Sequence, residues 1–344
     1  MAEAKPSHSL LIWGAGAIGG TIGAYLVRKG HDVTFVDIVP EHVQAIRTIG
    51  LAIEGPIDNF SVKAPAFTPH ELKGSFERIV LAVKAHHTRG AAHVLKPFLA
   101  PNGYVLSAQN GLNETVIADI VGAERTIGAF VNFGVDFLGP GRITYGGRGA
   151  FVLGELDGRI TPRLHALHKV ILDFEPGAII TDNIWGYLWG KLAYGAMLFA
   201  TALTNDSICD CLGNEKYFPL FRAIGREVMA IADAKGIKPQ GFNGFDPTAY
   251  TPDADEARAR RSAAEMVAHN AKSTKTHSGI WRDLAVRKRK TEIDAQIAII
   301  ADEAAALGRP APITRRLVEL IHDVEEGRRP LDRKNLDLLA EAMS

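Results

Sequence analysis

Short apolar runs separated by helical stretches occupy the first half of the chain. Runs rich in branched and aromatic residues predict β-strands at residues 9–13, 32–36, 78–83, 104–107 and 125–130. A turn or helix signal follows each of the first four, which is the order of parallel strands joined by crossover helices. Further β-like runs, with a helix at 161–173 among them, are expected to extend the sheet at its far edge; they occupy residues 141–145, 150–153 and 178–181.

Long helical patterns replace the β-rich runs from residue 183 onward. Helices are expected at residues 184–204, 217–235, 255–269, 291–307 and 312–326. The stretch 236–252 is dense in Gly, Pro, Asn and Phe, which is typical of a loop between helices. The change of pattern predicts an α/β chain in two domains, with a parallel-sheet domain over residues 1–182 and an all-helical C-terminal domain over residues 183–344.

The composition is that of a globular protein, and its charge gives no sign of a strongly charged macromolecular partner. A chain of 344 residues predicts about two domains. Lys plus Arg and Asp plus Glu balance at 39 each, so no global field attracts nucleic acid or anionic lipid. No apolar run approaches membrane-spanning length, and the polar N-terminus lacks the pattern of a signal peptide. We therefore expect neither a nucleic-acid nor a membrane partner.

The cysteines favour a reducing, cytoplasmic location. Cys209 and Cys211 are the only two in the chain, and they stand one residue apart. They are too close for an ordinary disulfide and too few for a structural zinc site. No feature of the sequence calls for a metal.

A glycine-rich turn follows the first predicted strand. Its sequence is GAGAIG, and it consists of Gly14, Ala15, Gly16, Ala17, Ile18 and Gly19. The first glycine permits the tight turn, the second lets the backbone approach a pyrophosphate, and the third allows the following helix to pack closely on the sheet. The helix N-terminus then offers unpaired N–H groups to the phosphates. This order of strand, turn and helix predicts a Rossmann dinucleotide-binding domain.

Asp37 at the end of the second predicted strand indicates which dinucleotide is bound. An acid about 20 residues after the glycine turn accepts hydrogen bonds from a ribose 2′-hydroxyl and repels a 2′-phosphate. No arginine stands in the segment VDIVP at 36–40 to hold such a phosphate. The sequence therefore favours NAD(H) over NADP(H).

Further segments resemble the ketopantoate reductase (2-dehydropantoate 2-reductase) family. They are VLAVKA at 80–85, QNGL at 109–112 and WGKL at 189–192, with TEID at 291–294 as a fourth anchor. Their order and spacing fit that family over nearly the whole chain. The resemblance implies a Rossmann domain joined to a helical domain, a nicotinamide-dependent oxidoreductase that interconverts a 2-keto acid and a 2-hydroxy acid, and a homodimer as the common assembly.

Lys84 and Asn110 follow the third and fourth predicted strands, at the carboxyl edge where open α/β sheets bind ligands. In the family, the matching positions lie beside the cofactor and the substrate. The resemblance therefore places Lys84 beside the cofactor, and Asn110 beside both the cofactor and the substrate. The alternative interpretation is a solvated lysine and a simple Asn-Gly turn.

Lys191 lies in the first long helix of the second predicted domain, with Trp185 and Trp189 nearby. Partial burial would lower its pKa and ease proton transfer near neutral pH. In the family, a lysine at this point of the chain is the general acid that protonates the carbonyl oxygen as hydride arrives. The resemblance therefore assigns a catalytic role to Lys191, whereas an isolated helical lysine is more often only solvated.

The stretch 277–290 ends in a short basic run, RKRK, for which an exposed turn is expected rather than a nucleic-acid patch. In one continuous helix Ser278 and Glu292 would lie about 21 Å apart, at ~1.5 Å per residue. A turn between two helices is needed if both are to reach one substrate. Thr291 is expected to cap the second helix, with Asp294 in its first turn.

Glu292 is expected to stay ionised at this helix N-terminus. The resemblance gives it a catalytic role, either accepting a substrate hydroxyl or holding Lys191; an acid placed only for the helix dipole is the alternative. Ser278 is a candidate contact for the substrate carboxylate. One extra residue in the basic turn leaves Ser278 and Gly279 as alternatives for the family's serine.

Two positions depart from the family's pattern. Ketopantoate reductases usually present asparagines one and two turns after the lysine, where this chain has Gly195 and Phe199. The hydroxyls of ketopantoate would lose partners at these substrate positions, so we expect a different, larger or more apolar 2-keto acid. Two other functions stay open: a 3-hydroxyacid dehydrogenase of similar plan, which the Glu292 segment argues against, and a redox sensor that binds NAD(H) without chemistry.

Overall fold

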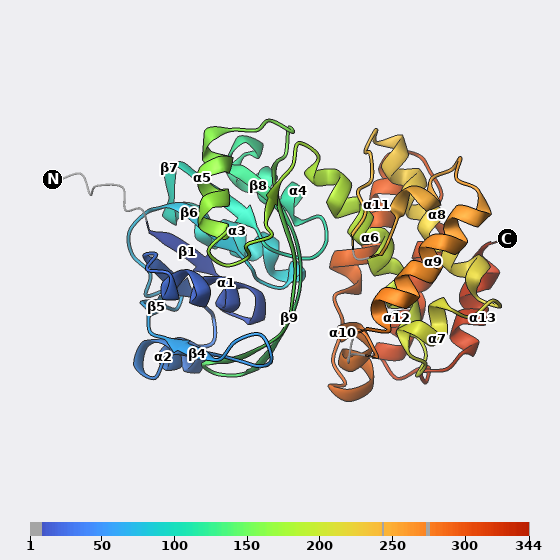
Figure 1. The fold of residues 1–344 in the computed structure, drawn as a ribbon, viewed down its shortest axis with the longest axis horizontal. Helices are drawn as coiled ribbons and strands as arrows, with labels where there is room; N and C mark the ends of the chain where they lie inside the picture. Colours follow the sequence, from blue (N-terminus) through green and yellow to red (C-terminus); the bar gives the residue numbers. More distant parts are fainter. Residues whose placement is uncertain (1–8, 243, 273–275, 344) are drawn as a thin grey trace. The chain divides into compact units, whose positions relative to one another are not determined.

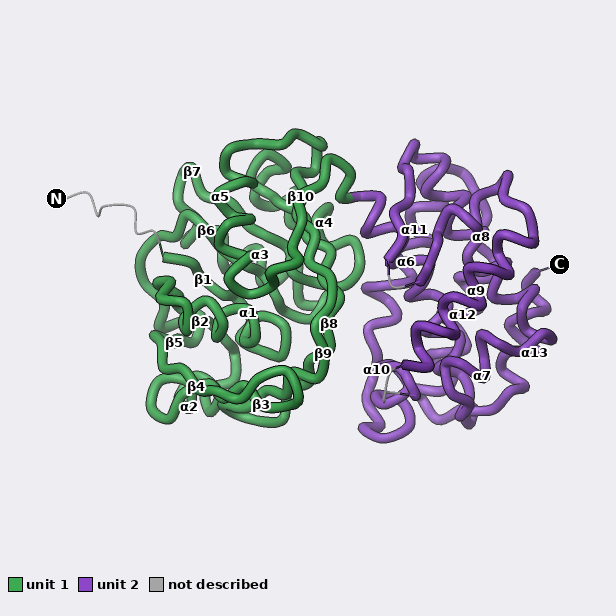
Figure 2. The backbone as a smooth tube through the Cα atoms, in the orientation of Figure 1, with its two compact units in different colours: residues 1–184 green, residues 185–344 purple. Residues whose placement is uncertain are grey.

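The computed structural model describes residues 9–242, 244–272 and 276–343. It consists of two compact units, Met1–Ile184 (unit 1) and Trp185–Ser344 (unit 2), which Figure 2 distinguishes by colour. The division falls at the first residue of helix α6 (Ile184–Thr201).

Unit 1 contains one ten-stranded sheet with helices on its faces (Figure 1). The strands are β1 (Leu10–Trp13), β2 (Val33–Val36), β3 (Leu51–Glu54), β4 (Phe60–Val62), β5 (Ala66–Phe67), β6 (Phe76–Leu81), β7 (Leu99–Ser107), β8 (Thr126–Gly139), β9 (Arg142–Glu155) and β10 (Ile179–Ile180). Their spatial order is β4-β3-β9-β8-β7-β6-β1-β2-β5, and β10 pairs with β9. The helices are α1 (Ala17–Arg28), α2 (Pro40–Thr48), α3 (Thr88–Leu95), α4 (Asn113–Val121) and α5 (Pro162–Ile171), with 3-10 turns at Ala85–His87, Lys96–Phe98 and Ala123–Arg125.

The strand order reverses beside β1, which pairs in parallel with β2 on one side and with β6 on the other. The chain passes from β1 to β2 and later returns to the opposite side of β1. In open α/β sheets, ligands bind outside the carboxyl ends of the strands at such a reversal. The turns after β1 and β6 carry Gly14 and Lys84, so both candidate positions lie at this point of the sheet.

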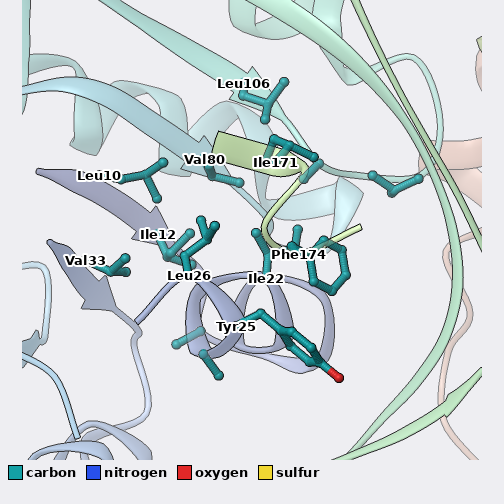
Figure 3. Packing of buried hydrophobic residues seen from close by; sticks show 14 of the residues in the cluster. Leu10, Ile12, Ile22, Tyr25, Leu26, Val33, Val80, Leu106, Ile171 and Phe174 are labelled. Carbon is teal, nitrogen blue, oxygen red and sulfur yellow. The ribbon is translucent and has the colours of Figure 1, made fainter. Parts of the chain in front are cut away.

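Both faces of the central strands are buried. Leu10 and Ile12 of β1 belong to the cluster that includes α1, whereas Leu11 and Trp13 belong to a second cluster with side chains of α3 and α4. Figure 3 shows the first cluster, where side chains from four strands meet those of α1: Ile12, Val33, Val80, Leu106, Ile22 and Leu26. Burial on both faces explains why these strands are nearly continuous apolar runs in the sequence.

The predicted parallel-sheet domain is confirmed, but its far side differs from the prediction. The runs at 141–145 and 150–153 belong to one strand, β9, which forms a long antiparallel hairpin with β8. β9 lies inside the sheet, and the edges of the strand order are β4 and β5. Glycines in the middle of β9 interrupt its apolar pattern, and β3, β4 and β5 are too short to give a clear one.

Unit 2 is helical, as predicted. It contains α6, α7 (Ile208–Leu212), α8 (Phe218–Ala234), α9 (Glu256–Asn270), α10 (Gly279–Trp281), α11 (Ile299–Ala306), α12 (Pro312–Glu325) and α13 (Lys334–Ala340), with 3-10 turns at Pro247–Tyr250 and Glu341–Met343. Two π-helical turns occupy Arg282–Val286 and Asp294–Ala298. Within the described part of this unit, β-type pairing is limited to one isolated bridge between Phe242 and Phe245. None of the described helices has the length and apolarity that crossing a bilayer would require.

Candidate active site

In the glycine-rich turn between β1 and α1, Gly14 and Gly19 are closely packed, whereas the space beside Gly16 is open. Gly14 has a φ of +96°, and a Cβ there would lie 2.9 Å from backbone atoms of Ala82 and Val83. A Cβ at Gly19 would overlap the carbonyl oxygen of Gly14. At Gly16, by contrast, a Cβ would meet no atom within 4 Å. This is the arrangement that lets a pyrophosphate approach the backbone.

The N-terminus of α1 has the properties of an anion site. Its cap residue, Gly16, has no side chain, and the first turn holds no acid. Across the described residues, the N–H groups of Gly16, Ala17 and Ile18 donate no hydrogen bond to the chain. Unpaired donors and the helix dipole together favour a phosphate at this position.

Asp37 is tied directly to the glycine-rich turn. Its Oδ2 accepts a hydrogen bond from the Ala15 N–H at 2.9 Å, and its Oδ1 accepts one from the Val39 N–H at 3.0 Å. Two backbone donors fix the plane of the carboxylate and leave lone pairs on both oxygens. Those lone pairs suit ribose hydroxyls, so the residues present fit a dinucleotide.

A buried chain of hydrogen bonds joins the turn after β6 to the turn after β7. The Gln109 amide donates to the carbonyl group just before Lys84 at 2.9 Å and to the Thr88 hydroxyl at 2.7 Å. Thr88 donates to Asn113 Oδ1, and Asn113 Nδ2 donates to the Asn110 carbonyl, both at 2.7 Å. The backbone at Lys84 and the backbone at Asn110 are therefore held by one network at the carboxyl edge of the sheet.

Replacing Thr88 with valine is expected to destabilise the protein and to lower kcat/KM. The substitution keeps the shape but leaves buried groups of Gln109 and Asn113 without a partner, which costs about 1–3 kcal/mol. Urea unfolding and steady-state kinetics measure the two effects. Thr115→Val is the matched control, because its hydroxyl bonds only to the Leu112 carbonyl in a partly exposed setting. Equal stability of the Thr88 variant and the wild type would contradict this prediction.

Lys191 lies on α6 beside the fully buried Trp189 and is itself partly exposed. Tyr194 follows on the same helix, and burial raises the pKa of its phenol, an effect only partly offset by the hydrogen bond with Asn270. The phenol therefore stays neutral near pH 7, and its oxygen also accepts a bond from the Asn270 amide at 3.0 Å.

Gly195 and Phe199 have different surroundings, although they follow Lys191 on the same helix. Among the described residues, the one atom within 4 Å of a Cβ built on Gly195 is Cδ1 of Ile297, at 3.9 Å. Phe199 is only 1% exposed. A side chain at position 195 would therefore first meet Ile297, whereas the ring of Phe199 is enclosed.

Ser278 begins the short helix α10, and its Oγ accepts a hydrogen bond from the Trp281 N–H at 3.1 Å. The hydroxyl hydrogen is a separate donor that this bond does not use. The exposed turn predicted for the basic run RKRK is confirmed. Arg287 and Arg289 both pair with Asp283, and Lys288 has a left-handed φ of 50°.

Glu292 lies at the start of the next helix, where its carbonyl accepts from the Gln296 N–H at 2.9 Å. Thr291 Oγ1 accepts a bond from the Ile293 N–H at 3.2 Å. The predicted N-cap role of Thr291 is not what the structure has, because the helical turn begins after Ile293, which caps it without a side-chain hydrogen bond. π-helical turns stand on both sides of this segment, at Arg282–Val286 and Asp294–Ala298. Such turns are rare and frequently occur at functional sites.

Glu325 of α12 anchors the residue before Glu292. One of its oxygens, Oε1, accepts hydrogen bonds from both the backbone N–H and the hydroxyl of Thr291, each at 2.6 Å. His322, one turn earlier on α12, pairs with Asp294 at 3.0 Å. The start of the helix that carries Glu292 is thus held against α12 on both sides of that glutamate.

Replacing Glu325 with alanine is expected to lower kcat/KM by about tenfold or more, because a loosened anchor misplaces Glu292. Steady-state kinetics at saturating cofactor measure the effect. Glu319→Ala on the same helix is the control, since Glu319 is largely exposed and makes only a surface pair with Arg316. Unchanged kinetics in the Glu325 variant would show that the anchor does not matter for turnover.

Sequence reasoning missed the residues that hold the site together. Thr88 and Glu325 act through contacts with residues distant in the sequence, and no periodic pattern or motif marks such pairs. Metal ligation gains no support: no cluster of three or more His, Cys, Asp or Glu side chains suited to an ion occurs in the ranges that the structure describes. Cys209 and Cys211 are free thiols.

Two family models match the chain. The model described as ketopantoate reductase PanE/ApbA matches residues 10–158, and its C-terminal counterpart matches residues 183–325. The chain belongs to the ketopantoate reductase family. The family resemblance of the four sequence segments is therefore confirmed.

Individual members of the family and related structures are similar over almost their whole length. A 2-dehydropantoate 2-reductase of Archaeoglobus fulgidus is 27% identical over 322 residues, covering 92% of this chain and 97% of that protein. The crystal structure of a PanE/ApbA family ketopantoate reductase from Ralstonia eutropha JMP134 is 28% identical, with a TM-score of 0.77, over 93% of this chain and 99% of that one. D-mandelate dehydrogenase with NADH and anilino(oxo)acetate shares the fold, with a TM-score of 0.79 and 21% identity over 93% and 98%.

Proposed function

We propose that the protein interconverts a 2-keto acid and a 2-hydroxy acid, with NAD(H) preferred over NADP(H). As a member of the ketopantoate reductase family, it is a nicotinamide-dependent oxidoreductase acting on CH–OH groups. The observation that carries the proposal is the uncapped N-terminus of α1, with the open backbone at Gly16 and the carboxylate of Asp37 beside it. In this proposal residues 1–182 bind the dinucleotide, and residues 183–344 bind the substrate and supply the catalytic groups.

The cofactor preference depends on charge. The carboxylate of Asp37 lies next to the glycine-rich turn, where it would repel a 2′-phosphate. The next side chains are the exposed Ile38 and Val39, neither of which could neutralise a phosphate. Lys84 and Asn110, held at the same edge by the Gln109 network, are proposed to contact the cofactor as well.

In the proposed mechanism, the bound nicotinamide supplies or accepts the hydride at C2 of the acid. Lys191 donates a proton to the carbonyl oxygen during reduction and takes it back during oxidation. Glu292 and Asn110 hold the substrate, and Ser278 donates its hydroxyl hydrogen to the substrate carboxylate.

The substrate is proposed to be more apolar than ketopantoate. Gly195 offers no hydrogen-bonding side chain one turn after Lys191, and Ile297 is its nearest neighbour. Phe199, two turns after Lys191, is enclosed and cannot contact the substrate with its ring, so the proposed change of substrate rests on Gly195. D-mandelate dehydrogenase, which shares the fold, was solved with anilino(oxo)acetate, an oxo acid bearing an aromatic ring. An aryl or branched aliphatic group on the 2-keto acid fits this position better than a hydroxylated one.

The test is the initial rate of NADH and NADPH oxidation with ketopantoate and a panel of aliphatic and aromatic 2-keto acids. The expected result is turnover with NADH that is fastest for an apolar member of the panel. Fast turnover of ketopantoate would remove the proposed change of substrate while leaving the reaction in place. Binding of NADH without turnover of any acid would support a redox sensor instead.

The family resemblance supports a proposed assembly, and the two free thiols support a proposed location. We propose a homodimer in the cytoplasm, where a reducing environment keeps Cys209 and Cys211 unpaired. Light scattering after size exclusion measures the mass in solution, and a monomer at working concentration would contradict the dimer.

A further inference from the structure

His42 of α2 lies outside every motif discussed above, yet it contacts the glycine-rich turn. Its side chain is 1% exposed. Nε2 lies 2.7 Å from the Ala15 carbonyl oxygen, and Nδ1 accepts a hydrogen bond from the Gly141 N–H at 2.9 Å. The Phe137 ring packs edge-on against the imidazole, with 5.0 Å between the ring centroids. The imidazole thus bridges the turn after β1 and the turn of the β8–β9 hairpin.

The two partners define the state of the ring. A backbone N–H only donates, so Nδ1 of His42 carries no hydrogen, and a carbonyl only accepts, so Nε2 carries one. The imidazole is therefore neutral and donates to Ala15. This buried position needs a side chain that accepts a hydrogen bond from Gly141 and donates one to Ala15. A neutral histidine does both with its two ring nitrogens.

The bond to Ala15 sets the direction of the next N–H group. The Ala15 carbonyl and the Gly16 N–H belong to one planar trans peptide group and point in opposite directions. Holding the carbonyl toward His42 therefore turns the Gly16 N–H away from α2. On the other side of the same residue, the Ala15 N–H is held by Asp37. Within the described chain the Gly16 N–H has no partner, which leaves it available to an anion.

We infer that His42 is a positioning residue of the cofactor site, which orients the Gly16 N–H toward the pyrophosphate through the Ala15 carbonyl. This inference rests on the proposed binding of NAD(H) by the glycine-rich turn. The hairpin turn at Gly141 has a part in it, because it fixes the imidazole from the other side. Gly141 is packed closely on α2, where a Cβ would lie 2.9 Å from the Cβ of Ala45.

Two substitutions separate the two hydrogen bonds. His42→Gln can keep a donor near the Nε2 position and hence the bond to Ala15, whereas His42→Asn can keep only an acceptor near Nδ1 for Gly141. The dissociation constant of NADH, measured by fluorescence, is expected to rise about five- to tenfold in the Asn variant and to change little in the Gln variant. In the Asn variant, kcat/KM for NADH should fall by more than kcat at saturating NADH does. Phe137→Ala is the control, since it removes the ring contact and keeps both bonds.

A purely structural role for His42 gives a different pattern. Both variants would then lose thermal stability while retaining the wild-type affinity for NADH, and that outcome would overturn the inference. Equal weakening of NADH binding in the Gln and Asn variants would overturn it as well. Failure of the wild type to bind NADH would instead refute the proposed function, and the inference with it.

A measurement on the unsubstituted protein covers the case of a variant that does not fold. In a spectrum of ¹⁵N-labelled histidine, the His42 ring is expected to show the neutral form with its hydrogen on Nε2, both without and with NADH. A hydrogen on Nδ1 would exclude the bond from Gly141 and contradict the inference.

Discussion

Replacing Lys191 with alanine is expected to lower kcat by about a hundredfold to ten-thousandfold, the usual contribution of a general acid. The binding of NADH should change little, because the proposed contacts of the dinucleotide are the glycine-rich turn and Asp37 and do not include Lys191. Stopped-flow measurement of NADH oxidation gives kcat, and fluorescence titration gives the dissociation constant. Loss of turnover without loss of NADH binding would place Lys191 in the chemical step.

Two further variants sharpen this result. Lys191→Arg keeps the positive charge but holds its proton too firmly to donate it near neutral pH, so it should be nearly as slow as the alanine variant. Lys216→Ala removes an exposed lysine that pairs with Asp337 and should leave turnover unchanged. Turnover at the wild-type rate in Lys191→Ala would remove the lysine from the mechanism.

Replacing Asp37 with asparagine should weaken NADH binding by about tenfold or more and shift the preference toward NADPH. The substitution keeps the shape but removes the charge that attracts ribose hydroxyls and repels a 2′-phosphate, and hydrogen bonds to a charged group are worth about 1.5–3 kcal/mol. The ratio of kcat/KM for NADH to that for NADPH measures the shift.

Asp32→Asn is the matched control for Asp37. Asp32 is an exposed acid just before β2, at the end of that strand opposite to Asp37. The same change of charge there should leave the cofactor preference as it is. An equal shift in both variants would mean that overall charge, rather than the position of Asp37, determines the preference.

Much of the fold follows from patterns that are local in the sequence. β1, β2, β6 and β7 are apolar runs because both of their faces are buried, and their order with the helices predicted the parallel sheet. The sequence predicts two separate strands where the structure has β9. The glycines in the middle of β9 have no side chains, so the alternating pattern of a strand is lost there. The short edge strands β4 and β5 bury too little to leave a pattern at all.

Some residues of the candidate site can likewise be predicted from local sequence patterns, and others cannot. Gly14, Gly16 and Gly19 can be predicted because they form a local motif, in which the geometry of the chain limits Gly14 and Gly19 to glycine and the open backbone at Gly16 suits a ligand. Lys84 and Asn110 can be predicted because they lie just beyond the ends of strands. Lys191 and Glu292 came from the family resemblance, since one charged residue on a helix carries no signal of its own. The contacts of His42 with Gly141, and of Glu325 with Thr291, join residues far apart in the chain and appear only once it is folded.

The decisive measurement is the transfer of deuterium from NADH labelled at C4 of the nicotinamide to a 2-keto acid that the rate panel has identified. Deuterium at C2 of the 2-hydroxy acid product, found by mass spectrometry and formed at least about a hundredfold more slowly with Lys191→Ala, is the predicted result. A wild-type protein that binds NADH yet transfers no deuterium to any acid of the panel would contradict the proposed reaction.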